Sequence, residues 1–243
     1  MAFRFNTPGV SLEILLSKPN RSKNKLVVTE VNGKMEVALL GDSILDNGAY
    51  VSGGRDVFAH LRAILPSDVG LELLARDGAV IDSLHKQLNN VRSRTTHLVI
   101  SVGGNDALKT MDLLACQVGT VAEALDHLSA TADRFRQSYD RMLEAVVDSG
   151  RSAAVCTIYY PRYDAPALQR RAVAALSHFN DAIILAASKA RLPILDLRRV
   201  CATAADYANW IEPSDIGGRL IADAIARMLA QHDFAASACQ LYV

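Results

Sequence analysis

A serine follows the first apolar stretch of the chain in a position suited to nucleophilic chemistry. Residues 37–40 are typical of a buried strand, and Gly41, Asp42 and Ser43 come directly after them. In an open parallel sheet, ligands bind outside the carboxyl ends of the strands, so the Ser43 hydroxyl is expected to meet a bound substrate. The same residue types also suit the N-cap of a helix, and this motif alone leaves both interpretations open.

A second polar block follows the third apolar stretch, residues 98–102. It consists of Gly103, Gly104, Asn105 and Asp106. Paired glycines let the backbone approach a ligand closely, and an Asn amide is a donor of the kind used in oxyanion holes. Gly-Gly-Asn-Asp alone is also typical of a turn, but two such blocks at one edge of the predicted sheet favour a site.

Together these blocks resemble the signature motifs of the GDSL-type (SGNH) serine-hydrolase superfamily, and the resemblance covers roughly residues 36–229. It implies that Ser43 is the nucleophile and starts the following helix, whose N-terminus favours developing negative charge. It also implies an oxyanion held by the Asn105 side chain and by the backbone N–H groups of Ser43 and Gly78. Gly78 is the weakest match, because a single glycine after a strand is common.

The fourth block departs from the family pattern, which is Asp-x-x-His-Pro before the last helix. The matching residues here are Asn209 and Glu212, followed by Pro213. An Asn can donate a hydrogen bond to a carboxylate, whereas a second carboxylate would repel it, so the two replacements are mutually consistent. We therefore expect Glu212, oriented by Asn209, to act as general base, provided that burial raises its pKa from near ~4.3. The alternative is that Glu212 caps the last helix and Ser43 is unactivated.

Neither a histidine nor a bound cofactor is expected to replace the missing base. None of the six histidines falls in a crevice loop: they are His60, His85, His127 and His178 in predicted helices, His97 at the start of the third strand, and His232 after the last helix. Asp42 and Asp106 could together hold a cation, but Asp42 is expected to cap or orient its turn. No G-x-G-x-x-G or G-x-x-x-x-G-K-[ST] motif follows the first strand, which disfavours a nucleotide-binding domain. We expect no metal and no cofactor.

The elements that position these residues alternate between strands and helices. The expected strands are residues 37–40, 71–75, 98–102, 153–158 and 192–197, and the expected helices are residues 57–64, 81–91, 121–147, 167–190 and 216–229. This alternation indicates βαβ units and a mostly parallel sheet covered on both faces. The resemblance implies more specifically a flavodoxin-like, three-layer αβα sandwich with five parallel strands in the order 2-1-3-4-5.

Composition and charge are those of an ordinary globular protein of 243 residues. Lys and Arg together number 26, as do Asp and Glu, so charge does not favour a nucleic-acid or anionic-membrane partner. No apolar stretch approaches the ~20 residues that span a bilayer, and the N-terminal apolar patch is interrupted by Glu13, so the cytoplasm is the expected location.

Of the four cysteines, Cys156 is expected to be a buried free thiol. Residues 1–32 are expected to extend a single domain of residues 33–243.

The sequence therefore supports two hypotheses of different classes. The first is a hydrolase or acyl transferase that acts on an ester or related acyl bond of a small molecule through Ser43. The second is a catalytically inactive binding protein with the same crevice. Residues 111–116 and 159–163 are expected to line the crevice, and their apolar and aromatic side chains favour an acyl or aromatic group. The sequence identifies neither the substrate nor the oligomeric state.

Overall fold

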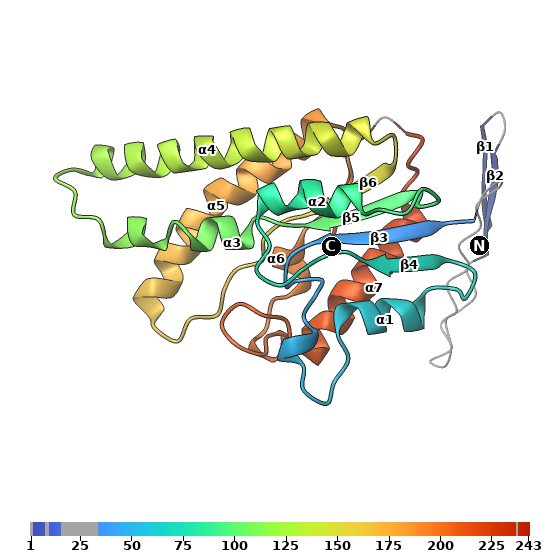
Figure 1. Ribbon diagram of the computed structural model, residues 1–243, viewed down its shortest axis with the longest axis horizontal. Coiled ribbons are helices and arrows are strands. Elements are labelled where there is room, and N and C mark those ends of the chain that lie inside the picture. The colour runs from blue at the N-terminus through green and yellow to red at the C-terminus, as the bar shows by residue number, and fades with distance from the viewer. Residues whose placement is uncertain (1, 8–9, 16–33, 237) are drawn as a thin grey trace.

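The main sheet has six parallel strands within the residues that the structure describes. The computed structural model describes residues 2–7, 10–15, 34–236 and 238–243 (Figure 1). The sheet strands are β3 (Glu36–Gly41), β4 (Gly70–Leu73), β5 (His97–Ser101), β6 (Ser152–Cys156), β7 (Ile194–Leu195) and β8 (Leu241–Tyr242). Their order is β4-β3-β5-β6-β7-β8, which confirms the predicted order 2-1-3-4-5 and adds β8 beside β7. The sequence did not predict β8, because a two-residue strand carries almost no pattern.

The long helices lie where the apolar spacing predicts them. The α-helices are α1 (Val57–Ile64), α2 (Leu84–Asn89), α3 (Gly104–Leu108), α4 (Val121–Asp148), α5 (Pro166–Lys189), α6 (Leu197–Val200) and α7 (Asp215–Gln231). In the described ranges, four short 3₁₀ helices join them: η1 (Gly48–Tyr50), η2 (Ile81–Ser83), η3 (Met111–Ala115) and η4 (Ala204–Asp206). Asp56, Thr120 and Ser214 accept hydrogen bonds from backbone N–H groups as N-caps of α1, α4 and α7.

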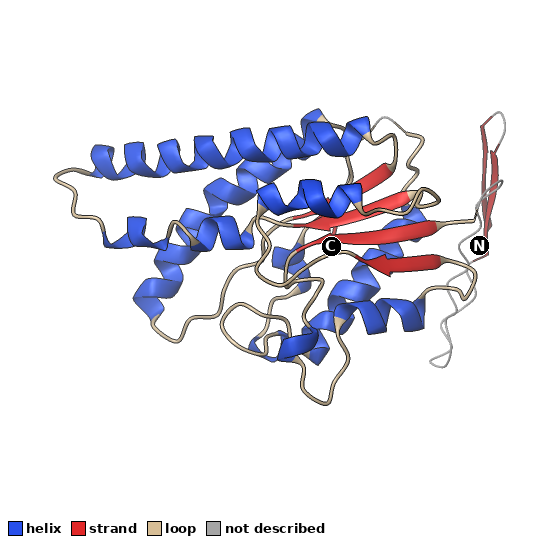
Figure 2. Ribbon diagram, viewed as in Figure 1, coloured by secondary structure: helices blue, strands red, loops and turns tan. Residues whose placement is uncertain are grey.

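Helices cover both faces of the sheet, as expected for parallel strands (Figure 2). Side chains alternate across β3: Val37 and Leu39 join the core shared with α1 and α7, whereas Ala38 and Leu40 join the core shared with α2, α4 and α5. All four side chains are fully buried, so the central strand is apolar on both faces. The three-layer αβα fold predicted from the sequence is therefore confirmed.

The described part of the N-terminal extension forms its own small sheet. Strands β1 (Ala2–Thr7) and β2 (Val10–Leu15) pair with each other in antiparallel register and are not hydrogen-bonded to the main sheet. Residues 16–32 of the predicted extension lie outside the described residues. The domain boundary at residue 33 stays a prediction.

The close approach of β3 and β5 at their carboxyl ends fixes the start of the serine loop. Gly41 has φ = +130°, and a Cβ at this position would lie 1.7 Å from the carbonyl oxygen of Ser101. The buried Gln87 side chain accepts a hydrogen bond from the Gly41 N–H at 2.7 Å and donates one to the Gly41 carbonyl at 2.8 Å. Only glycine therefore fits where the strand turns into the serine loop.

We predict that Gly41→Ala destabilises the protein by at least ~4 kcal/mol, because the methyl group collides with strand backbone. Gly53→Ala is the matched control: Gly53 also has a positive φ, +75°, but a Cβ there meets no atom within 4 Å. Its cost should be only the backbone strain, about 1–2 kcal/mol. Urea unfolding of both variants measures the difference, and equal losses of stability would contradict the collision at Gly41.

Candidate active site

Ser43 lies on a single helical turn at the carboxyl end of β3. The Leu45 and Asp46 N–H groups both donate to the Asp42 carbonyl, at 3.2 and 3.1 Å, and the Ile44 N–H donates to Asp42 Oδ1 at 3.2 Å. Asp42 thus orients this turn, as expected. The chain does not continue as a helix, since α1 begins only at Val57. The expectation that Ser43 starts a helix is therefore wrong, and the serine turn carries no helix whose N-terminus could favour negative charge at the Ser43 hydroxyl.

The Ser43 hydroxyl donates a hydrogen bond to the Glu212 side chain. Ser43 Oγ lies 3.0 Å from Glu212 Oε1, and the two side chains are 6% and 5% exposed. The other carboxylate oxygen, Glu212 Oε2, is buried without a hydrogen-bond partner among the described residues. Burial, more than any other influence, raises the pKa of Glu212 from its ordinary 4.5 to about 7, while the Ser43 hydrogen bond opposes the rise.

Both backbone polar groups of Glu212 are hydrogen-bonded within the loop between η4 and α7. The Glu212 N–H donates to Asn209 Oδ1 at 2.9 Å, and the Glu212 carbonyl accepts from the Ala208 N–H at 2.8 Å. The carbonyl of Pro213 accepts from the side-chain amide of Asn47 at 3.1 Å. Because Asn47 follows the serine turn, this bond ties the Glu212 loop directly to the Ser43 loop.

Asn209 does not orient the Glu212 carboxylate as expected. Its Oδ1 accepts hydrogen bonds from the backbone N–H groups of Ile211 and Glu212, both at 2.9 Å. Oε1 of Glu212 is bonded to Ser43, and Oε2 has no partner in the part of the chain that the structure describes. The expectation of a side-chain bond from Asn209 to Glu212 is therefore wrong, because Asn209 uses its oxygen to form an Asx turn. Asn209 shapes the loop and leaves the carboxylate unsupported.

The block of residues 103–106 lies beside the turn that contains Gly78. Asn105 Nδ2 donates to the Ala79 carbonyl at 3.0 Å, and Asp106 Oδ2 accepts from the Ile81 N–H at 3.1 Å. Asn105 lines the same pocket as Ser43, and an Asn amide has a second N–H that can reach a ligand. Gly78 is exposed in the adjoining turn and does not line this pocket. The structure thus brings Ser43, Asn105 and Glu212 to one pocket but leaves Gly78 out of its lining.

Two buried carboxyl groups flank Ser43 in this pocket. Asp42 is 2% exposed, and burial raises its pKa from 3.8 to about 8, with the negative charge of Glu212 adding to the rise. No Lys, Arg or His lines the pocket to offset these charges. At neutral pH the site therefore favours a protonated Asp42, so that Glu212 is the carboxyl group available as a proton acceptor.

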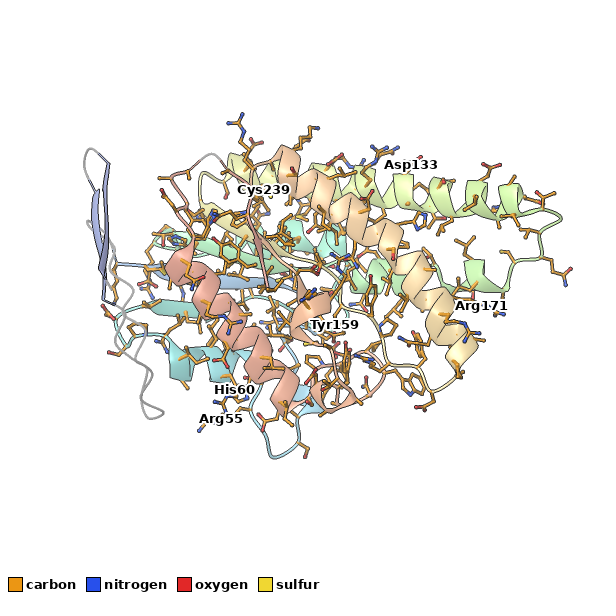
Figure 3. All side chains as sticks on the ribbon, turned by 180° about the vertical axis from the view of Figure 1, so that it is seen from behind. Arg55, His60, Asp133, Tyr159, Arg171 and Cys239 are labelled. Carbon is orange, nitrogen blue, oxygen red and sulfur yellow. The ribbon has the colours of Figure 1, made fainter. Side chains whose placement is uncertain are left out.

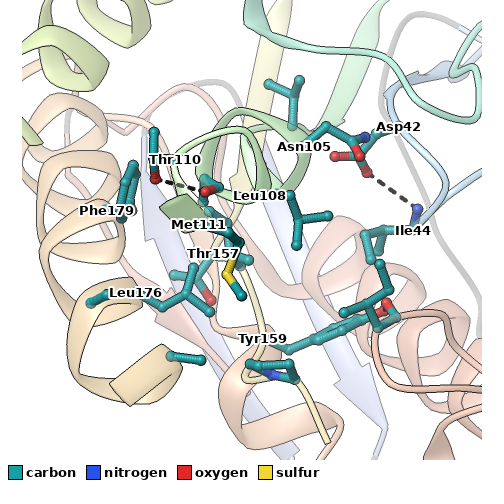
Figure 4. A pocket seen from close by; sticks show the side chains of 18 of the residues that line it. Asp42, Ile44, Asn105, Leu108, Thr110, Met111, Thr157, Tyr159, Leu176 and Phe179 are labelled. Carbon is teal, nitrogen blue, oxygen red and sulfur yellow. Dashed lines mark hydrogen bonds between the residues drawn. The ribbon is translucent and has the colours of Figure 1, made fainter. Parts of the chain in front are cut away.

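The pocket extends from Ser43 into an apolar space between helices (Figure 4). Its walls come from α3, η3, α4 and α5 and from the segment after β6. Met111, Tyr159 and Tyr163 are among the lining residues, so the expectation that residues 111–116 and 159–163 contribute to the crevice is confirmed in part. Tyr159 is buried, and its hydroxyl donates to the Ile211 carbonyl, next to Glu212.

No histidine lines the pocket. His60 Nε2 lies 2.5 Å from Asp215 Oδ1, and Figure 3 shows His60 at the periphery beside Arg55, away from Tyr159. Within the described residues, no group of three or more His, Cys, Asp or Glu side chains could hold a metal ion. All four cysteines are free, and Cys156 is buried as predicted. No helix in the described ranges is long and apolar enough to cross a membrane.

Sequence reasoning missed two buried amides that build the site. The Gln87 side chain forms two hydrogen bonds with the backbone of Gly41 at the end of β3. The Asn47 side chain joins the serine loop to the Glu212 loop. Asn47 is 0% exposed, and its Oδ1 also accepts from the Val57 N–H at 2.9 Å. Asn47-Gly48 has the composition of an ordinary exposed turn, so nothing in the sequence marked Asn47 as a buried connection.

Comparisons with known proteins agree on one family and one fold. Residues 39–220 match the model of the GDSL-like lipase/acylhydrolase family. Similar solved structures include the lipase Lip_vut3 from a goat rumen metagenome (TM-score 0.63, 16% identity, 82% of this chain and 99% of that chain). They also include the acetyl xylan esterase AlAXEase (TM-score 0.60, 19% identity, 79% of this chain and 98% of that chain). A third is phospholipase A1 from Streptomyces albidoflavus NA297 (TM-score 0.56, 17% identity, 78% of this chain and 98% of that chain). No curated protein sequence matches the chain.

We predict that the buried Asp42 makes the protein less stable as pH rises. Its pKa is raised on folding, so it stabilises the folded state most below pH ~4, and this stabilisation is lost as pH rises towards about 8. In Asp42→Asn the free energy of unfolding should fall much less as pH rises, and the smaller decrease that remains should come from Glu212. The free energy of unfolding, measured in urea from pH 4 to pH 9, tests this. Parallel pH profiles of the wild type and Asp42→Asn would show that Asp42 is not buried in its protonated form.

Proposed function

The chain belongs to the GDSL-like lipase/acylhydrolase family, and from this membership we propose that it is an acyl-ester hydrolase in which Glu212 activates Ser43. The observation that carries the proposal is the 3.0 Å hydrogen bond from Ser43 Oγ to Glu212 Oε1 in a buried, largely apolar pocket. A nucleophile within hydrogen-bond reach of a base is the geometric requirement for a covalent acyl-enzyme.

In the proposed first half-reaction, Glu212 takes the proton of the Ser43 hydroxyl as Oγ attacks the carbonyl carbon of the ester. The developing oxyanion is held by the free N–H of the Asn105 amide and by the Ser43 backbone N–H. The tetrahedral intermediate then collapses, the ester C–O bond breaks, and Glu212 returns the proton to the leaving alcohol. In the second half-reaction Glu212 deprotonates a water as its oxygen attacks the acyl carbon. The bond between that carbon and Ser43 Oγ then breaks, Glu212 returns the proton to Oγ, and the carboxylic acid leaves.

The pKa of Glu212 supports this role. A free glutamate is too weak a base for a serine hydroxyl at neutral pH, whereas a base with a pKa near the working pH combines a useful basic fraction with useful proton affinity. Burial brings the pKa of Glu212 to about 7, which is in that range. The missing partner at Oε2 contributes in the same direction, because an unpaired buried oxygen disfavours the charged form.

A catalytically inactive binding protein is the second candidate, and the geometry of Asn209 favours it. In the family pattern this position orients the base, whereas here it bonds only to backbone N–H groups. Within the described part of the chain, the hydrogen bond from Ser43 is therefore the only one that holds the Glu212 side chain. An unactivated Ser43 would bind acyl groups in the same pocket without turnover, so the reactivity of Ser43 separates the two candidates.

We predict that a fluorophosphonate labels Ser43, with a rate that rises about tenfold per pH unit below pH ~7 and levels off above it, because only ionised Glu212 accepts the proton. Glu212→Gln preserves the shape of the side chain but cannot take the proton, so labelling should fall by roughly 10²–10⁴-fold. Ser43→Ala should abolish labelling at this site. Mass spectrometry of the labelled peptide gives rate and position together.

Glu72→Gln is the matched control for this experiment. Glu72 is also a buried glutamate, but it lies on β4 and is bonded to Thr95 at 2.6 Å and to Arg92, outside the pocket. Its loss should leave labelling unchanged. Complete inertness of wild-type Ser43 would favour the binding protein. Labelling that survives Glu212→Gln undiminished would leave Ser43 as nucleophile and remove Glu212 as its base.

We predict that Asn105→Ala lowers kcat for a hydrolysed ester by roughly 10²–10³-fold, the usual loss for one oxyanion donor. The variant also loses the hydrogen bond to the Ala79 carbonyl, which should cost only about 1 kcal/mol of stability. Steady-state kinetics combined with urea unfolding separates the two effects. Wild-type kcat in a folded Asn105→Ala protein would remove Asn105 from the mechanism.

A further inference from the structure

The loop that follows β6 is hydrogen-bonded to the loop between η4 and α7. We name residues 158–163 the β6 loop. The Arg162 N–H donates to the Trp210 carbonyl at 2.7 Å, and the Tyr159 hydroxyl donates to the Ile211 carbonyl. These two acceptors belong to the last two residues before the proposed base in the chain. The β6 loop is therefore bonded to the backbone that leads directly into the base.

Aromatic rings pack between the same two loops. The rings of Tyr159 and Tyr207 meet edge to face with their centroids 5.1 Å apart, and the Tyr207 hydroxyl donates to the Tyr160 carbonyl at 2.8 Å. Both tyrosine side chains are buried. A second ring contact, between Tyr163 and Trp210, has its centroids 6.1 Å apart. Close packing thus adds to the hydrogen bonds in fixing the two loops relative to each other.

Two amide side chains of α5 hold the β6 loop in its turn. Asn180 Oδ1 accepts from the Ile158 N–H and Asn180 Nδ2 donates to the Ile158 carbonyl, both at 2.8 Å. Gln169 Oε1 accepts from the Tyr163 N–H at 2.9 Å, and Gln169 Nε2 donates to the Pro161 carbonyl at 2.7 Å. Asn180 is fully buried. Because both ends of the β6 loop are bonded to one long helix, this loop can position what it touches.

The direction of the Glu212 side chain depends on the loop that carries it. Among the residues that the structure describes, Ser43 gives the only hydrogen bond to the carboxylate, and Asn209 bonds to backbone N–H groups instead. The loop backbone therefore decides where the carboxylate lies. Reacting groups tolerate little displacement, since a misplacement of about 1 Å can lower a rate roughly 10²-fold. The Tyr159 hydroxyl controls this backbone, because its acceptor is the residue next to Glu212.

From these contacts we propose that Tyr159 is a positioning residue, whose hydroxyl bond to Ile211 places Glu212 against Ser43. The proposal rests on the function proposed above, because it gives Tyr159 the orienting role that Asn209 does not fill. It also implies a change at Glu212 that can be measured without turnover. A loop released from Tyr159 would admit water to Glu212, and because burial is the main cause of its raised pKa, that pKa would fall towards 4.5.

Tyr159→Phe tests the proposal, because it removes only the hydroxyl and keeps the ring that lines the pocket (Figure 4). The plateau rate of fluorophosphonate labelling at Ser43 should fall roughly 10²-fold. The pH at which labelling is half-maximal should move below the wild-type value of about 7. The variant leaves unchanged the other ionisable groups that act on Glu212 from neighbouring elements, which are Asp42, Asp77 and Tyr50.

Tyr139→Phe is the matched control. Tyr139 is also fully buried, but its hydroxyl has no hydrogen-bond partner within the described ranges, so the variant should keep both the wild-type rate and the half-maximal pH. Gln169→Met is a second test, should Tyr159→Phe fail to fold. It removes two hydrogen bonds between α5 and the β6 loop at a side chain outside the pocket lining. It should lower the half-maximal pH in the same direction.

Carbon-13 NMR of the glutamate carboxyl groups separates this proposal from the proposed chemistry. The Glu212 signal is assigned by its absence in Glu212→Gln and is followed from pH 4 to pH 9. A lower pKa of Glu212 in Tyr159→Phe, in a protein whose Ser43 is inert, would support the positioning and refute the chemistry. Labelling that depends on Glu212 but keeps its rate and pH profile in Tyr159→Phe would do the reverse. A slower rate with an unchanged pH profile and an unchanged Glu212 titration would overturn the proposal and leave Tyr159 a structural role.

Discussion

The packing of Gly41 against the Ser101 carbonyl is the constraint on which the site depends. β3 and β5 are neighbours at the centre of the sheet, and their carboxyl ends approach so closely that no side chain fits between them. The serine loop leaves from the first strand and the Asn105 block from the second. This separation is fixed by backbone contact and not by flexible side chains, so it holds Ser43 and Asn105, the proposed nucleophile and the proposed oxyanion donor, at a constant distance from each other.

The second half of the site depends on how the protein buries a carboxylate without a cation. Asn209, Ala208 and Asn47 hold the main chain around Glu212, while the carboxylate itself has only Ser43 as a hydrogen-bond partner among the residues that the structure describes. A buried charge with so few partners is costly, and the protein responds by shifting the pKa towards neutrality. Because few groups stabilise the negative charge of Glu212, the carboxylate binds a proton more tightly and is a stronger base than a free glutamate.

Long-range organisation was predictable from the sequence, because strand and helix periodicities reflect burial directly. Short, local geometry was not. The single turn at Ser43, the Asx turn at Asn209 and the two-residue strand β8 all depend on where one or two hydrogen bonds go. Asn209 shows the difficulty best, since an Asn side chain can donate or accept and only the folded loop decides between the two. Glu212 was found beside Ser43 because its place in the fourth block was enough to locate it.

The bond between Ser43 and Glu212 joins residues that are 169 positions apart in the chain. Such a contact forms only after the intervening strands and helices have closed a very long loop, which is the slow part of folding for a parallel sheet. During synthesis the serine emerges long before its partner, and Glu212 acquires its raised pKa only when folding removes it from water. If Glu212 activates Ser43 as proposed, incomplete or misfolded chains carry the serine without its base, so that labelling of Ser43 would report a completed fold.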